Sequence, residues 1–250
     1  MKKLHNRVAL ITGAASGIGK AIALKFASEG ANVAIVDIDR QSSEKLVSEI
    51  EAQGCKAIYV ECDVTNETHV NHAVESTVNQ LGALHILVNN AGVSPLKPLP
   101  EIDLEEWKKV LAINLTGPFL FMKITFDVIA KAGKKGRVIN MGSLAGQIGG
   151  ISVGLHYTAS KGGIMAMSKQ LAKMLAPYGA TSNCIAPGTT DTPLVQAWPK
   201  ETRQSLIKMI PLGRLGLPTD VASAALFFAS GDAQFITGAT INVNGGMFIG

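Results

Sequence analysis

Short apolar runs alternate with helical patterns along this 250-residue chain, and this alternation constrains the fold more than any other feature of the sequence. Strands that are separated by helices form βαβ units, whose parallel sheet is covered by helices on both faces. The chain contains no linker, repeat or low-complexity tract that would divide it, so we expect one domain over residues 1–250. The prediction is a doubly wound α/β fold with seven parallel strands, near 8–12, 32–37, 56–61, 84–88, 136–142, 180–186 and 239–243.

The first predicted strand is followed by a glycine-rich turn. Val8-Ala-Leu-Ile-Thr12 leads into Gly13-Ala-Ala-Ser-Gly17-Ile-Gly19, and an Ala-rich helical pattern continues to Ser28. Strand, glycine turn and helix follow in this order at dinucleotide sites, where glycines let the backbone approach a pyrophosphate and the helix N-terminus attracts its charge. Because the spacing G-x-x-x-G-x-G departs from the commoner G-x-G-x-x-G, this interpretation needs support from the rest of the chain.

The second predicted strand supplies that support. It ends in the carboxylate of Asp37, 18 residues after Gly19, about where an acidic residue reaches an adenosine ribose. Such a carboxylate accepts hydrogen bonds from the ribose hydroxyls and repels a 2′-phosphate, so Asp37 favours NAD over NADP. Arg40, which could swing toward a phosphate, argues against this preference. An ordinary strand-end turn is the structural alternative for Asp37.

The segment 143–161 brings a hydroxyl, a phenol and an ammonium together. Tyr157 and Lys161 are four residues apart and would share one face of a helix. A free phenol has a pKa of about 10, and a nearby ammonium lowers it. Tyr157 could then exchange a proton with a carbinol oxygen during hydride transfer, with Ser143 beside it. Taken alone, Tyr157 and Lys161 are also a common helical pair, and Ser143 an ordinary strand-end hydroxyl.

The motifs, taken in order, resemble those of the short-chain dehydrogenase/reductases over nearly the whole chain. The ordered set is far more specific than any one of its members. The resemblance implies a Rossmann-like sheet with the strand order 3-2-1-4-5-6-7, which right-handed crossovers also favour. The motifs that carry it are the glycine turn, Asp37, Asp63-Val64, Asn89-Asn90-Ala91-Gly92, Asn114, Ser143, Tyr157, Lys161 and Pro187-Gly188.

The resemblance also implies roles for single residues. Tyr157 would be the acid/base, Ser143 would orient the substrate oxygen, Lys161 would hold the ribose, and Asn114 would hold a water in a proton relay. Thr190 stands where the family usually has an aliphatic residue. The resemblance therefore does not extend to the detailed contacts of this segment with the carboxamide of the nicotinamide. The residues expected to contact the cofactor are Gly13, Ser16, Gly17, Ile18, Gly19, Asp37, Asp63, Val64, Asn90, Tyr157, Lys161, Pro187, Gly188, Thr190 and Thr192.

These roles predict an NAD(H)-dependent oxidoreductase that interconverts a secondary alcohol and its ketone. The pocket candidates carry no group for binding a carboxylate or phosphate, which favours a neutral alcohol, polyol or sugar. A 3-oxoacyl-[acyl-carrier-protein] reductase is the alternative, although such enzymes usually use NADPH. A non-catalytic NAD sensor is disfavoured by the intact catalytic set. The substrate candidates are Ser94, Ser143, Gln147, Tyr157 and Trp198, with Leu96, Leu144, Ile148 and His156 as further pocket positions.

The segment 189–217 contains Trp198 and is delimited by prolines, which predicts a short helical lid over the cleft. Closure of a lid excludes water from hydride transfer. A surface helix docked on the core is the structural alternative.

Composition and charge limit which binding partners and which cellular compartment are expected. The net charge of +4 is modest and dispersed, so nucleic acid is not an expected partner. No apolar stretch reaches the roughly 20 residues that span a bilayer, and none resembles a signal-peptide core, so we expect a cytoplasmic protein that does not bind membranes. The cysteines lack C-x-x-C spacing and predict free thiols. His69 and His72 lack a third ligand, so no metal site is expected.

The helical stretches 104–129 and 155–176 are apolar on more than one face, and the chain ends in the uncharged sequence Asn244-Gly-Gly-Met-Phe-Ile-Gly250. Apolar surface is costly to leave in water and usually marks a contact. We therefore predict a homotetramer, as is common in the family, with the tail at one twofold interface. The alternative is that Phe248 and Ile249 fold back onto their own sheet.

Overall fold

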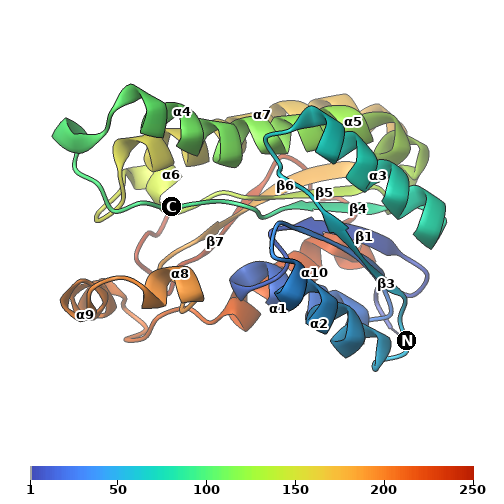
Figure 1. Cartoon of the computed structure of the whole chain (residues 1–250), viewed down its shortest axis with the longest axis horizontal. Coiled ribbons are helices and arrows are strands. Elements are labelled where there is room, and N and C mark those ends of the chain that lie inside the picture. Colours follow the sequence, from blue (N-terminus) through green and yellow to red (C-terminus); the bar gives the residue numbers. More distant parts are fainter. Residues whose placement is uncertain (1) are drawn as a thin grey trace.

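A computed structural model describes residues 2–250 and shows a central sheet between two layers of helices (Figure 1). Each predicted strand is present, with its ends moved by at most two residues. The strands are β1 (Val8–Thr12), β2 (Asn32–Asp37), β3 (Ala57–Glu61), β4 (Ile86–Asn89), β5 (Arg137–Met141), β6 (Thr181–Pro187) and β7 (Thr240–Val243). The α-helices are α1 (Gly17–Ser28), α2 (Arg40–Glu51), α3 (Glu67–Leu81), α4 (Leu104–Leu111), α5 (Gly117–Lys131), α6 (Ala145–Ile148), α7 (Leu155–Leu175), α8 (Pro193–Gln196), α9 (Lys200–Met209) and α10 (Pro218–Ala229).

All seven strands pair in parallel in one sheet, in the order β3-β2-β1-β4-β5-β6-β7. This confirms the predicted doubly wound fold. The strand order reverses between β1 and β4, and in open α/β sheets the crevice outside the carboxyl ends of the strands at such a switch point is where ligands bind. The topology therefore places a ligand site after Thr12 and Asn89.

The two faces of the sheet carry separate hydrophobic cores. Helices α1, α2 and α10 cover one face, where Phe26 and Phe228 are fully buried. Helices α3, α5 and α7 cover the other face, where Phe121 and Leu175 are fully buried. Strands that are buried on both faces are expected to be continuously apolar, as β1 is, whereas the equally buried β6 begins with the polar residues Thr181, Ser182 and Asn183.

The continuous helical stretch Leu104–Lys131 is long and apolar enough, by length and composition, to cross a bilayer, and 44% of its most apolar window is buried in the fold. The sequence prediction concerned uninterrupted apolar stretches, whereas this helix meets a criterion of length and mean hydropathy. A count of uninterrupted apolar residues misses this helix because polar side chains such as Asn114 and Thr116 interrupt the run. A helix that packs on the core of a globular protein meets the same criterion, and α5 buries Phe121 and Ile129 against the sheet.

Candidate active site

The glycine turn after β1 is held in a shape that side chains would prevent. Gly13 and Gly17 have φ angles of 62° and 53°, and a Cβ atom at Gly19 would lie 2.2 Å from the carbonyl oxygen of Gly13. Asn90, directly after β4, donates from Nδ2 to the carbonyl oxygens of Thr12 and Gly13 at 3.0 and 2.9 Å. Asn90 therefore holds the turn, in addition to the cofactor contact predicted for it.

A cavity of about 370 Å³ lies over this turn. It is lined by most of the residues that were predicted to contact the adenosine and pyrophosphate parts of a dinucleotide, together with apolar residues that the sequence did not single out. The predicted residues in its wall are Gly13, Ser16, Gly17, Ile18, Asp37, Asp63, Val64, Asn90 and Thr192. Gly19 is outside this wall and lies beneath the turn, where it makes room for the Gly13 carbonyl.

The two acidic residues of this cavity are fixed by backbone amides. Asp37 accepts the N–H of Ala15 at 2.9 Å through Oδ2 and the N–H of Asp39 at 3.0 Å through Oδ1. Hydrogen bonds from the backbone and hydroxyl of Thr65 hold the pKa of Asp63 below its usual range. The Asp63 carboxylate is therefore ionised at neutral pH, and the Asp37 carboxylate is held in place at the end of β2.

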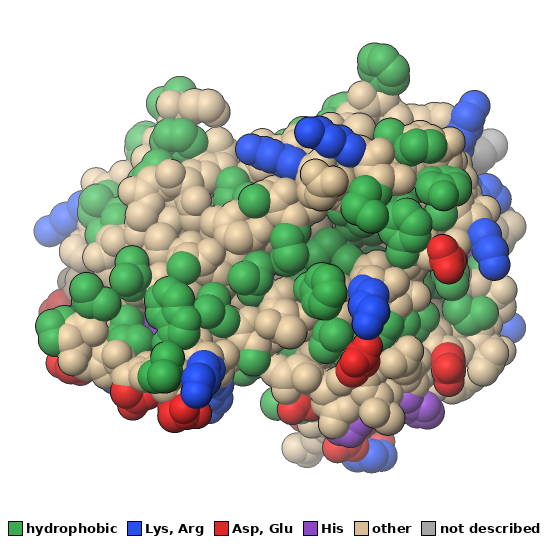
Figure 2. Space-filling view, turned by 90° about the horizontal axis from the view of Figure 1, so that it is seen from above, with side chains coloured by type: hydrophobic (Ala, Val, Ile, Leu, Met, Phe, Trp, Pro, Cys, Tyr) green, Lys and Arg blue, Asp and Glu red, His purple; other side chains and the backbone are tan. Residues whose placement is uncertain are grey.

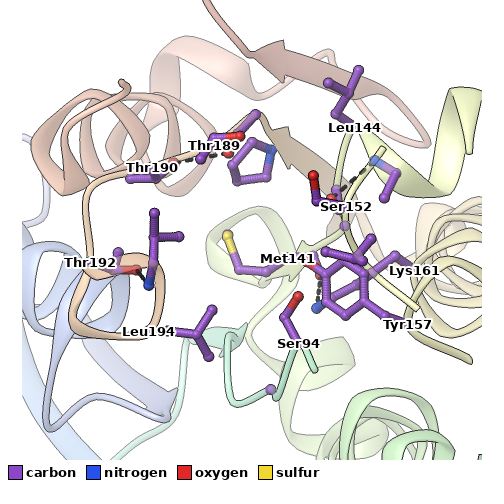
Figure 3. Close-up of a pocket in the computed structure, with 18 of the residues that line it drawn as sticks. Ser94, Met141, Leu144, Ser152, Tyr157, Lys161, Thr189, Thr190, Thr192 and Leu194 are labelled. Atoms are coloured by element: carbon purple, nitrogen blue, oxygen red, sulfur yellow. Dashed lines mark hydrogen bonds between the residues drawn. The ribbon is translucent and has the colours of Figure 1, made fainter. Parts of the chain in front are cut away.

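A second cavity, of about 180 Å³, adjoins the first (Figure 3). The walls of both cavities include Ile18, Asn90, Gly92, Val93, Thr192 and Leu194, so the two spaces are contiguous. Ser143, Tyr157 and Lys161 meet in the second cavity. The remaining predicted residues in its wall are Ser94, Leu144, Pro187, Gly188, Thr190 and Trp198.

Tyr157 lies in the first turn of α7, with its ring partly accessible from the cavity and surrounded by protein. Burial raises the pKa of Tyr157, whereas hydrogen bonds with the hydroxyls of Ser143 and Ser94 lower it. The lowering that the sequence analysis assigned to Lys161 remains a prediction. In the structure, Lys161 directs its ammonium to a backbone carbonyl.

Lys161 lies one turn further along α7, as predicted, and its side chain is buried. Its Nζ lies 5.7 Å from the centroid of the Tyr157 ring and donates to the carbonyl oxygen of Met141 at 2.9 Å. Burial lowers the pKa of Lys161 to about 8. The ammonium is therefore charged at neutral pH and carries a desolvation penalty.

Asn114 lies in a π-helical turn, Ala112–Thr116, between α4 and α5. π-Turns inside α-helices are frequent at functional sites. The Asn114 amide accepts the N–H of Val93 and donates to the carbonyl oxygen of Val93, both at 2.9 Å, and it also donates to Ser160 at 3.2 Å. A Cβ atom at Gly92 would lie 3.2 Å from Asn114 Oδ1 and 3.5 Å from Lys161 Nζ, so glycine keeps open the space between them. The proton relay assigned to Asn114 remains a prediction.

Four candidate substrate residues are not among the described residues that line the second cavity. They are Leu96, Gln147, Ile148 and His156. Gln147 was predicted to line the pocket, but it lies on the short helix α6, outside this wall, and its Oε1 is buried without a hydrogen-bond partner among residues 2–250. His156 was expected to face either the substrate or another subunit, and its side chain is fully buried instead. These two predictions are corrected.

The structure adds wall residues that sequence reasoning missed, and most of them are apolar. Most of them come from the loop before α7, the segment of α8 and α9, and the C-terminal tail, and the others lie at or shortly after the ends of β4, β5 and β6. No motif marks them, although the apolar residues of the segment 189–217 and of the tail had indicated a contact surface. The added residues are Val93, Met141, Ile151, Ser152, Val153, Thr189, Leu194, Val195, Leu206 and Met247.

Among residues 2–250, the part of the chain that the structure describes, no group of three or more potential metal ligands occurs. Cys55, Cys62 and Cys184 are free cysteines.

Comparison with known proteins relates the chain to enzymes of one family. A family model described as "Enoyl-(Acyl carrier protein) reductase" matches residues 13–248. The 3-oxoacyl-[acyl-carrier-protein] reductase FabG of Thermotoga maritima is 38% identical over 99% of this chain and 100% of that protein. Glucose 1-dehydrogenase 2 of Bacillus subtilis is 38% identical over 98% of this chain and 96% of that protein. The crystal structure of a short-chain type dehydrogenase/reductase from Mycobacterium marinum superposes with a TM-score of 0.95 at 32% identity, covering 99% and 98% of the two chains.

Proposed function

The chain belongs to the short-chain dehydrogenase/reductase family of oxidoreductases, and from this premise we propose that it uses NAD(H) to interconvert a secondary alcohol and its ketone. One observation supports the reaction above all others. Tyr157 lines the second cavity together with Ser143 and Ser94, and the wall of this cavity shares residues such as Asn90 and Thr192 with the cavity over the glycine turn. A proton donor and acceptor thereby lies in a space that is contiguous with the proposed cofactor cavity.

The first cavity fits a dinucleotide. The positive φ angles of Gly13 and Gly17 form a turn that a pyrophosphate can approach closely, and the fixed carboxylate of Asp37 lies at the end of β2. Ser16, Gly17 and Ile18 would hold the pyrophosphate, Asp37 the adenosine ribose, and Lys161 the other ribose. The nicotinamide ring, when bound, supplies the hydride acceptor or donor.

The residues of the chain handle the proton. Ser143 and Tyr157 would bind the carbinol oxygen, and Tyr157 would take its proton in oxidation or return it in reduction. Ser94 and Ser143 stabilise the phenolate by hydrogen bonding, which opposes the effect of burial. The buried ammonium of Lys161 adds a positive charge on the same side of the ring. Asn114 would connect Lys161 to solvent through water.

The walls of the second cavity support a neutral substrate. Among the described residues that line it, Lys161 is the one charged side chain, and apolar residues such as Val153, Leu194 and Trp198 predominate. An anionic substrate would meet no arginine there. Reduction of a 3-oxoacyl thioester is the second candidate function. It is supported by the similarity to the 3-oxoacyl-[acyl-carrier-protein] reductase of Thermotoga maritima, which is 38% identical along its whole length. The thioester would reach the same apolar cavity with an uncharged acyl chain.

The proposed function is tested by following NADH absorbance with a panel of secondary alcohols, sugars, polyols, hydroxysteroids and acetoacetyl thioesters. We expect turnover with a neutral alcohol or sugar. Activity confined to the thioester would support the second candidate, and tight NADH binding without turnover on any substrate would support a non-catalytic sensor. The three free cysteines are consistent with action in the reducing cytoplasm.

The cofactor preference yields a prediction of its own. We expect kcat/KM to favour NAD over NADP by at least tenfold, on the order of 1.4 kcal/mol, because a 2′-phosphate would meet the Asp37 carboxylate. Arg40, the one argument against this preference, pairs with Glu61 at 2.8 Å and lies 3.6 Å from Glu44. Replacing Asp37 with serine should narrow the gap, and equal use of NADP by the unmodified enzyme would refute the assignment.

We also propose that the enzyme is a homotetramer with the tail at one interface. Hydrophobic side chains gather on the face formed by α4, α5 and α7 in Figure 2, where Leu104, Phe119 and Met174 are exposed. In the tail, Met247 lines the second cavity, whereas the side chain of Ile249 is 89% exposed and does not fold back onto the sheet. Light scattering should show a tetramer for the full chain and dimers after truncation behind Gly246.

Truncation should also lower activity, because it removes Met247 from the cavity wall. A monomeric full chain would contradict the assembly. A truncated chain that remains tetrameric would contradict only the part assigned to the tail.

A further inference from the structure

Three polar side chains meet behind Tyr157 and have no part in the chemistry described above. Lys97 lies in the loop after β4, Glu106 lies on α4, and His156 lies on α7. The ammonium of Lys97 donates to Oε2 of Glu106, and Oε1 of Glu106 lies 3.6 Å from Nε2 of His156. Lys97 holds the pKa of Glu106 below its usual range, so the carboxylate is charged beside the fully buried imidazole.

The imidazole caps the helix that carries the acid/base. Tyr157 is the third residue of α7, where a backbone N–H has no partner within the helix. Nδ1 of His156 accepts this N–H at 2.9 Å. An imidazole nitrogen that accepts a hydrogen bond carries no proton, so the proton of the neutral ring is on Nε2, the side that faces Glu106. The Glu106 carboxylate favours this tautomer through its negative charge, since at 3.6 Å it lies just beyond hydrogen-bond distance and Nε2 has no other partner among the described residues.

The same group packs against the loop that supplies Ser94. The N–H of Gly154, directly before α7, donates to the carbonyl oxygen of Pro95 at 3.1 Å. A Cβ atom at Gly154 would lie 2.3 Å from Cε1 of His156 and 3.2 Å from the carbonyl oxygen of Lys97. Because there is no free space at this point, a shift of His156 or Lys97 would change the distance between Ser94 and the start of α7. Figure 3 shows the Ser94 hydroxyl directed toward the Tyr157 ring.

We propose that Lys97, Glu106 and His156 form a positioning group that holds the Tyr157 phenol against the hydroxyls of Ser94 and Ser143. None of the three touches the reacting atoms. They act by fixing the first turn of α7 and the loop of Ser94 relative to each other. The assignment rests on the proposed function for the statement that Tyr157 transfers the proton, but the geometry of the phenol is measurable without turnover.

Two substitutions loosen the group at different points. Glu106→Gln removes the charge that orients the imidazole and preserves the size of the side chain. His156→Asn retains an acceptor near the position of Nδ1 but removes Nε2, so it keeps the cap and loses the connection to Glu106. Glu105→Gln is the matched control, because Glu105 is the neighbouring residue on α4, is 82% exposed and pairs only at the surface with Lys108.

The position of the phenol is read by NMR from tyrosine labelled with ¹³C at Cζ. The chain has three tyrosines, the Tyr157→Phe variant assigns the signal, and Tyr178, which is half exposed, provides an internal reference. At pH 7 we expect the Tyr157 signal to move toward that of Tyr178 in Glu106→Gln and in His156→Asn, and to stay in place in Glu105→Gln. With the best substrate of the panel, we expect kcat to fall about 3- to 10-fold and the apparent pKa in its pH profile to rise by ~0.5, since weaker hydrogen bonds favour the phenolate less. The Kd for NADH should stay within about twofold.

An unchanged Tyr157 signal in both variants would overturn the proposal. So would a parallel loss of NADH affinity and thermal stability that accounts for the fall in kcat, because that result is expected from a purely structural role. If the unmodified enzyme turned over no substrate of the panel, the proposed function would fail, while the NMR measurement would still decide whether the three residues position Tyr157.

Discussion

Replacing Tyr157 with phenylalanine is expected to lower kcat by a factor of about 100 or more while leaving NADH binding within about twofold of the unmodified enzyme. The substitution removes one oxygen from a ring that lies in the second cavity and keeps the ring itself. A loss of this size is typical of removed general acid/base catalysis. Stopped-flow measurement of hydride transfer, together with a fluorescence titration of NADH, separates the chemical step from binding.

Serine variants provide the matched controls for this prediction. Ser143 and Ser94 are the hydroxyls that lower the pKa of Tyr157, so Ser143→Ala and Ser94→Ala should each reduce kcat less than Tyr157→Phe does. In both serine variants the apparent pKa in the pH profile of alcohol oxidation should rise, because the neutral phenol is then favoured further by burial. Near-normal turnover by Tyr157→Phe would show that another group transfers the proton.

Much of the site could be predicted because its chemistry follows strand ends. Thr12, Asp37 and Asn89 end parallel strands, and the carboxyl ends of parallel strands meet at one edge of the sheet. The four-residue spacing of Tyr157 and Lys161 placed both on one face of α7. Local sequence rules are sufficient for such features, since each depends on the period of a helix or on the direction of a strand.

Other features of the site depend on contacts between elements that lie far apart in the sequence. The pKa of Tyr157 depends on Ser94, which precedes it by 63 residues, and sequence spacing gives no information on that contact. His156 was judged by its neighbour in the chain, although its environment is set by Glu106 on another helix. Met247 reaches the cavity because the tail packs beside Pro211, which lies in the loop after α9. Tertiary packing decided each of these cases.

Replacing Lys161 with methionine is expected to impair function more broadly than the loss of the phenol. Turnover should fall by roughly 10²- to 10⁴-fold, because the buried ammonium beside Tyr157 is removed. The Kd for NADH should rise by about tenfold, since Lys161 is also the residue expected to hold a ribose. Lys169→Met, an exposed substitution on the same helix, should change neither quantity.

The same substitution should stabilise the fold at neutral pH. Burial lowers the pKa of Lys161 from 10.5 to about 8, which corresponds to a penalty on the order of 3 kcal/mol for the charged form. Loss of the hydrogen bond to the Met141 carbonyl offsets about 1 kcal/mol of this penalty. Urea denaturation at pH 7 should therefore show that the free energy of unfolding of the variant is about 2 kcal/mol higher than that of the unmodified enzyme.

The pH dependence of this gain tests its cause. Between pH 8 and about 10 the unfolded lysine still binds a proton that the native one has released, so the stability of the unmodified enzyme rises with pH and the advantage of the variant shrinks. A gain that is constant across this range would assign the effect to packing instead of charge. A variant that is less stable at pH 7 would show that the ammonium is better solvated in the fold than its burial indicates. If the gain appears below pH 8 and fades above it, the enzyme retains a buried cation beside its acid/base at a cost in stability, as expected of a group selected for chemistry.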